Sequence, residues 1–281
     1  MQGPPAALVH EVEHALALLQ HRHVLDDDAI HEIRQGLKRA RAALRLLRDA
    51  IPARVYAREN RRLRDAARPL AAARDARVML AVLDELIAHT GSRPYRPMLA
   101  RLRSQLQRPY ARHLAAARAP RRVAAMRRQL ERSLESAAGW SLPRELHAIY
   151  AGGLARVYGQ GREALDEAAA KRTAAALHEW RKQAKYLAAA LALVAAKKSR
   201  AAKARKRAEE LAHELGDEHD LAVLVAVLRR RRADAALLAE LERRRRKLQK
   251  RALNAGQRLY RRSPERFIAH LQDISPAPST P

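Results

Sequence analysis

Two segments of the chain carry basic side chains at intervals of three and four residues. The first segment contains His31, Arg34, Lys38, Arg41 and Arg45. On an α-helix this spacing places all five side chains on one face, along about 21 Å of helix length. Guanidinium and ammonium groups are strong donors to phosphate oxygens, and a protonated histidine can donate as well. This face therefore predicts binding to an anion whose charges repeat along a line.

The second segment, residues 177–193, repeats the polar order of the first segment, residues 30–46, at a shift of 147 residues. The matching pairs are His31 with His178, Glu32 with Glu179, Arg34 with Arg181, and Lys38 with Lys185. Lys182 adds a further cation to the second face. A second similarity follows downstream, and its pairs are Arg58, Arg61 and Arg62 with Lys203, Lys206 and Arg207, and Asp75 and Val78 with Asp220 and Val223. The sequence therefore predicts a tandem duplication.

The two basic segments lack the acids that would neutralise them. Six basic residues and no acid occur from Arg34 to Arg48, and ten basic residues and no acid from Arg181 to Arg207. Exposed helices commonly pair a Glu with a Lys or Arg one turn away, and these segments do not. The formal net charge of +27 points the same way, towards a polyanionic partner. The alternative is that both segments are ordinary solvated helix faces in an arginine-rich chain.

Nucleic acid, an anionic membrane and polyphosphate are the candidate polyanions. Aromatic residues make up only 4% of the chain and do not alternate with the arginines, which argues against stacking on bases. No apolar run approaches the ~18 residues that span a bilayer, and the N-terminal stretch lacks a basic leader. We therefore expect a cytoplasmic protein that binds no membrane, with nucleic-acid binding as the alternative function.

Catalytic and metal-binding motifs are weak in this sequence. The absence of cysteine excludes disulfides, iron–sulfur clusters and thiolate zinc sites. Residues His10–His14 fit the HExxH pattern of zinc peptidases, but no third ligand is well placed downstream. In the acidic, histidine-containing stretch 213–220, we expect Gly216 to end one helix and Asp217 to cap the next. We expect no metal, no cofactor and no catalytic residue.

Two other features leave an alternative open. Asp75 and Asp220 either cap helices or orient the basic residue that precedes each, Arg74 or His219. Two arginine runs could contact a nucleic-acid backbone, but flanking acids favour solvated helix faces. These runs are Arg229–Arg232 and Arg243–Lys247.

The composition predicts an all-α fold, because Ala, Leu, Arg and Glu dominate and no strand-like alternation occurs. The expected helix breaks are Pro52, Gly91–Pro94, Pro120, Gly139–Pro143, Gly159–Gly161, Gly216 and Ser263–Pro264. The domain should cover residues 5–272, as repeats 5–138 and 141–272 that form two antiparallel helical bundles. The Ser- and Pro-rich tail, 273–281, is expected to be disordered.

The paired basic segments resemble the signature of CHAD domains, the conserved histidine α-helical domains. The family pattern, His-x-x-Arg-x-x-x-Lys/Arg-x-x-Arg, reads His31, Arg34, Lys38 and Arg41 in the first half, and His178, Arg181 and Lys185 in the second. Ala188 stands where the second motif often has arginine, and Tyr186 replaces a common basic residue. The resemblance implies bundles related by a pseudo-two-fold axis around a basic central groove. It also implies binding of inorganic polyphosphate and association with polyphosphate granules.

The sequence thus leads to a set of candidate binding residues for a non-catalytic polyphosphate-binding protein. They are His31, Arg34, Lys38, Arg41, Arg45, Arg58, Arg61, Arg62, His178, Arg181, Lys182, Lys185, Lys203, Lys206 and Arg207.

Overall fold

A computed structural model describes residues 3–21, 25–88, 90–143 and 145–271, and the predicted tail lies outside these residues. The fold is all-α, as predicted, and the described residues form no strand. The α-helices are α1 (Pro4–His21), α2 (Asp27–Leu46), α3 (Ala53–Ala67), α4 (Ala71–Ala88), α5 (Arg96–Arg118), α6 (Pro120–Ala138), α7 (His147–Lys171), α8 (Ala174–Val194), α9 (Arg200–Arg230), α10 (Ala235–Leu259) and α11 (Pro264–Leu271). Three short 3-10 turns join them: η1 (Arg48–Ala50), η2 (Arg68–Leu70) and η3 (Thr90–Tyr95).

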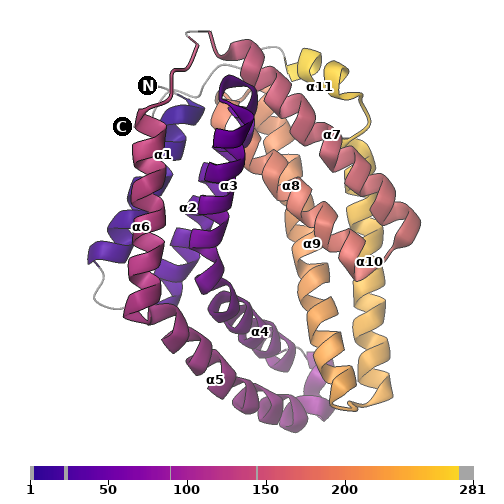
Figure 1. Cartoon of the computed structure of the whole chain (residues 1–281). Helices are drawn as coiled ribbons and strands as arrows, with labels where there is room; N and C mark the ends of the chain where they lie inside the picture. The colour runs from indigo at the N-terminus through magenta and orange to yellow at the C-terminus, as the bar shows by residue number, and fades with distance from the viewer. Residues whose placement is uncertain (1–2, 22–24, 89, 144, 272–281) are drawn as a thin grey trace.

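The helices pack around three apolar cores. Helices α1, α2, α3 and α6 enclose the first, which includes Ile30 and Leu130. Helices α7 to α11 enclose the second, around Trp180 and Tyr158. Figure 1 shows these two groups side by side, with α4 and α5 running from the first group to the tips of α9 and α10. A third core forms at those tips, where leucines of α4 and α5 pack against leucines of α9 and α10. The two predicted repeats are therefore joined by shared apolar packing.

Several helix ends have a local cause in the sequence, and the breaks predicted at Pro120 and Gly139 are confirmed. Asp26 caps α2, since its carboxylate accepts a hydrogen bond from the Ala29 amide at 2.7 Å. Pro120 begins α6, where a proline costs no intrahelical hydrogen bond. Gly139 ends α6 and Asp234 caps α10.

The breaks predicted at Gly159–Gly161 and Gly216 are wrong. Helix α7 continues through the first of these and α9 through the second, so Asp217 caps nothing. A Cβ at Gly161 would collide with the Tyr260 ring. Gly161 therefore makes room for that ring, whereas a Cβ at Gly216 would make only ordinary contact with the guanidinium of Arg181 beside it.

The HExxH motif serves helix packing. Glu11 forms two hydrogen bonds with Arg39, and His14 Nε2 lies 3.1 Å from Glu32 Oε1, so both contacts tie α1 to α2. Across the described parts of the chain, no group of three or more His, Asp or Glu side chains is arranged to hold a metal ion.

The arginine run of α10 is partly structural rather than simply solvated. The side chain of Arg245 is only 12% exposed and donates a hydrogen bond to Glu218, whose side chain is 1% exposed. Arg243 and Arg244 pair with Glu240 in the same helix. None of the helices that the structure describes is long and apolar enough to cross a bilayer.

Adjacent glycines of α7 provide a test of the packing between α7 and α2. A Cβ at Gly153 would lie 2.8 Å from Leu46 Cα, whereas one at Gly152 would meet only Asp49, at 4.0 Å. We expect Gly153→Ala to lower the free energy of unfolding by about 1–3 kcal/mol through overpacking. Gly152→Ala should raise it by about 0.5–1 kcal/mol, because alanine favours the helix. Urea denaturation followed by circular dichroism measures both, and changes of the same sign would contradict this packing.

Candidate functional site

Helices α2 and α8 pack against each other and bring the two predicted basic faces together. The groups that depress the pKa of Lys38 electrostatically include Arg34 of its own helix and Arg181 of α8. Those acting on Lys185 include Lys38 and Arg34 of α2. Motif residues that are 147 positions apart in sequence are thus neighbours in space.

The amphipathic pattern of each helix determines this arrangement. On α2, Ile30, Ile33 and Leu37 are each 1% exposed and point into the first core. On α8, Trp180 and Leu187 are fully buried in the second core. The basic side chains are left between the two cores, where they are partly buried rather than fully solvated.

Burial and neighbouring cations lower the pKa of two lysines at the centre of the cluster. The pKa of Lys38 is lowered to about 8, first by burial and then by the neighbouring guanidinium of Arg34. The pKa of Lys185 is likewise lowered to about 8, by burial and then by Arg181. Both lysines therefore gain or lose a proton near pH 8, and a nearby anion would favour their protonated form.

Three histidines flank the lysines. The rings of His178 and His219 lie with their centroids 4.4 Å apart, and burial lowers the pKa of both. Burial and the guanidinium of Arg74 also lower the pKa of His31. His178 Nδ1 and Arg181 Nε are buried, and neither has a hydrogen-bond partner within the described structure. The cluster therefore contains polar groups that its own side chains do not satisfy.

Helices α4 and α9 each add an aspartate and a basic residue to the cluster. Asp75 of α4 raises the pKa of Arg34 and Lys38, although burial outweighs it at both. Asp220 of α9 has the same effect on Lys185 and His219. Both aspartates lie inside helices, so the capping alternative is wrong; of the two basic residues that precede them, His219 is acted on electrostatically by Asp220.

Arg74 and His219 were missing from the predicted binding residues although both act on this cluster. Their signal in the sequence is their position directly before the matched aspartates, Asp75 and Asp220.

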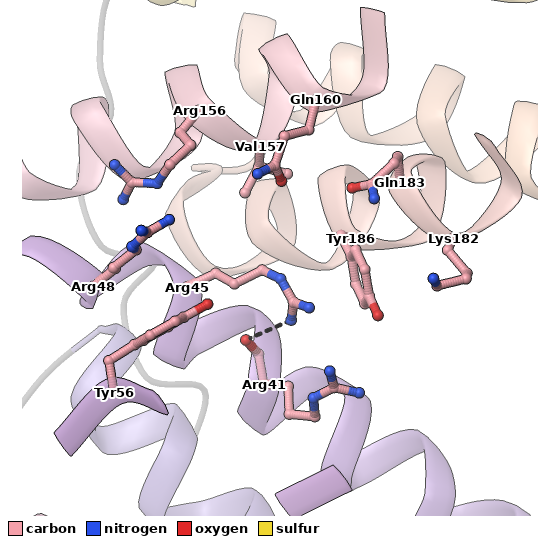
Figure 2. Close-up of a pocket in the computed structure, with 10 residues that line it drawn as sticks. All are labelled: Arg41, Arg45, Arg48, Tyr56, Arg156, Val157, Gln160, Lys182, Gln183 and Tyr186. Carbon is pink, nitrogen blue, oxygen red and sulfur yellow. Dashed lines mark hydrogen bonds between the residues drawn. The ribbon is translucent and has the colours of Figure 1, made fainter. Parts of the chain in front are cut away.

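Arg41, Arg45 and Lys182 extend the basic face beyond the lysines and line a pocket, shown in Figure 2. Arg41 Nε donates to Asn60 Oδ1 at 3.0 Å, and Arg45 stacks on the Tyr186 ring with its guanidinium carbon 3.7 Å from the centroid. Ala188, at the position that matches Arg41, is buried in the second core. The basic face of α8 is therefore shorter than that of α2.

The structure does not bring Arg58 and Arg62 into the cluster. Both donate to Glu59, a fully buried carboxylate that also accepts from Ser133 of α6. These contacts hold α3 against α6. Arg61 is exposed, and no hydrogen bond or ion pair of the described residues engages it.

Lys203, Lys206 and Arg207 also lie away from the cluster. All three are exposed in the first turns of α9, about 18–24 Å of helix before His219. Arg207 acts electrostatically on His270 of α11 instead. The downstream match in sequence therefore pairs residues of similar charge, but their side chains do not lie in the cluster.

Comparisons with known proteins agree with the fold. The family model described as the CHAD domain matches residues 6–229. The crystal structure of the CHAD domain from the plant Ricinus communis is similar in fold, with a TM-score of 0.50 and 22% sequence identity over 95% of this chain and 89% of that one. No curated protein matches the chain. The family match covers most of the sequence, including both basic helices, and the chain belongs to the CHAD-domain family.

Proposed function

We propose that this protein binds inorganic polyphosphate, without hydrolysing it, along the basic face between α2 and α8. The observation that carries the proposal is the pair Lys38 and Lys185, two partly buried lysines on helices that pack together, both of which Arg34 and Arg181 act on electrostatically. Like charges held together in this way are unfavourable until an anion joins them. A ligand with one charge on every repeating unit would relieve the repulsion along the whole face.

The shape of the cluster favours a single phosphate chain over a nucleic acid. The basic side chains lie partly buried between two helices, so a slender polymer reaches them more easily than a duplex. The aromatic residues nearest to the face, Tyr186 and Tyr56, lie in contact with or near arginines, so they are not free for bases. Nucleic-acid binding would use only the general charge of the surface.

The side chains of this face suit the binding of phosphates rather than their hydrolysis. Two carboxylates beside the lysines, Asp75 and Asp220, lie among cations that they help to keep charged. In this proposal the arginines and lysines hold phosphates by charge-assisted hydrogen bonds, and the protein associates with polyphosphate granules.

Competition between polyanions tests the proposal directly. We expect labelled long-chain polyphosphate, bound at near-physiological salt, to resist duplex DNA, single-stranded RNA and ATP at matched phosphate concentration by at least about tenfold, or about 1.4 kcal/mol. The chain length, checked on a gel afterwards, should be unchanged. Displacement by DNA or RNA, phosphate for phosphate, would move the function to nucleic-acid binding, and shortened chains would indicate hydrolysis.

Charge reversal in either basic helix should weaken polyphosphate binding strongly. We expect Arg34→Glu with Lys38→Glu, and separately Arg181→Glu with Lys185→Glu, each to reduce affinity by more than about tenfold. The slope of log affinity against log salt should fall by about 0.7 for each phosphate that the variant no longer neutralises. Fluorescence anisotropy with end-labelled polyphosphate measures both quantities, and circular dichroism checks that the variants fold.

A matched control lies on α5. Arg108 and Arg112 have the same spacing of four residues, both are exposed, and neither has a partner among the residues that the structure describes. Arg108→Glu with Arg112→Glu makes the same change in net charge and should have only a small effect. An effect equal to that of the α2 and α8 variants would replace the defined face with diffuse charge.

Binding should weaken as the pH rises through about 8. Below this pH Lys38 and Lys185 are charged in the free protein, and above it they lose their protons. A bound polyanion raises their pKa, so binding at pH 8 should take up protons. We expect affinity to fall about tenfold or more between pH 7 and pH 9.5 at constant salt.

Calorimetry in buffers of different ionisation enthalpy measures the proton uptake. The double variant Lys38→Arg with Lys185→Arg is the control, because arginine stays charged throughout this range. If its affinity falls with pH as steeply as that of the wild type, these two lysines are not the titrating groups.

A further inference from the structure

A pocket of about 310 Å³ lies at the end of the α2 basic face, where α2, η1 and α3 meet α7 and α8 (Figure 2). Three arginines of one helical stretch enter it in succession, Arg41, Arg45 and Arg48, and α7 and α8 supply its other side. The lining residues are Arg41, Arg45, Arg48, Tyr56, Arg156, Val157, Gln160, Lys182, Gln183 and Tyr186.

The lining of this pocket is cationic and carries no carboxylate among the residues that the structure places there. Arg156 Nη1 donates to Asp49 Oδ2 at 2.9 Å, and Lys182 pairs with Glu179, but neither acid lines the pocket. Arg156 Nη2 is buried and has no acceptor in the described structure. An anion in the pocket would meet several cations whose charge is only partly balanced.

The central cations of the pocket are already held in place. Arg45 stacks on Tyr186 and also donates to the backbone oxygen of Arg41 at 3.1 Å. Arg41 is fixed by its hydrogen bond to Asn60, and burial lowers its pKa. Side chains ordered before binding lose little conformational entropy when a ligand arrives. The pocket therefore presents cations that are ordered before any ligand binds.

The size and lining limit the ligand to a compact, oxygen-rich anion. A volume of about 310 Å³ holds a few phosphate groups and lies at the small end of ordinary ligand sites. Val157 is the one aliphatic residue in the described lining, whereas Gln160, Gln183 and the tyrosines offer hydrogen-bonding groups.

The end of a phosphate chain differs chemically from its middle. An internal unit has one ionised oxygen, whereas a terminal phosphate, like a phosphomonoester, carries about 1.5–2 negative charges at pH 7. Several arginines converging on one small volume match the terminal group better than an internal one. We propose that this pocket binds the terminal phosphates of a phosphoanhydride chain, while the α2–α8 face binds the internal units.

This inference rests on the proposed function, because it assigns the pocket to the end of the same polymer. Free triphosphate presents the same terminal chemistry and serves as the probe. The variant Gln160→Glu adds a carboxylate to the pocket at an exposed position of α7 and leaves every arginine in place. Gln107→Glu, at an exposed position of α5, is the matched control.

We expect Gln160→Glu to weaken the binding of inorganic tripolyphosphate by about tenfold or more, and Gln107→Glu to leave it within about twofold. Polyphosphate whose two ends are capped as amides should bind wild type and Gln160→Glu equally, because it lacks dianionic ends. Uncapped short chains should bind wild type more tightly than capped chains of the same length. Isothermal titration calorimetry at constant salt measures all three.

The outcomes separate this inference from the proposed function. If Gln160→Glu changes neither tripolyphosphate nor uncapped short chains, while Arg34→Glu with Lys38→Glu abolishes long-chain binding, the pocket inference is wrong and the function stands. If Gln160→Glu weakens capped and uncapped chains alike, the pocket binds internal units, and the inference is again wrong. If wild type binds tripolyphosphate in the pocket but not long chains, the proposed function fails and the pocket remains a site for free oligophosphates.

Discussion

The main physical constraint on this structure is that like charges lie close together between two helices. Lys38 and Lys185 lie near each other and near two guanidinium groups, and the pKa of both lysines falls to about 8. A lysine whose folded pKa lies below its unfolded value binds fewer protons when folded, so it costs stability at pH 7 and stops doing so as the pH rises from about 8 towards 10.5. The cost of each lysine is on the order of a few kcal/mol. Apolar packing must offset it.

That packing comes from the opposite sides of the same helices. The apolar face of α2 is buried in one core and that of α8 in another, while a third core joins the two halves at the tips of α9 and α10. Gly153 allows α7 to lie directly against the end of α2, which also positions the pocket wall. Because apolar packing holds the cations together, their repulsion persists in the free protein. An anion that binds between the helices would relieve this repulsion, and the relief would add to its affinity. Stability and ligand affinity are therefore opposed at the same side chains.

Spacing in the sequence predicted which basic residues lie together between α2 and α8, but it did not predict where the other basic residues point. The periodicity of α2 and α8 determines which side faces the core, so the opposite faces and the motif residues on them could be predicted. The directions of Arg58 and Arg62 could not, because they depend on Glu59, buried between α3 and α6. Gly216 was misread for a similar reason. A glycine is a common helix end, and only the tertiary structure reveals that Arg181 packs on it.

The two halves also differ in a way that makes the two ends of the site different. In the first half, Arg41 and Arg45 continue the basic face to the pocket, whereas in the second half Ala188 is buried at the matching position and Tyr186 supports Arg45. The histidines and aspartates surround the lysines at one part of the face, and the convergent arginines lie at the end of α2. A polymer lying along this face meets different chemistry at its two ends. Because the two ends of a polyphosphate chain are identical, this asymmetry does not select a direction of the chain. It selects the part of the face that would hold a terminal phosphate, which in our proposal is the pocket at the end of α2.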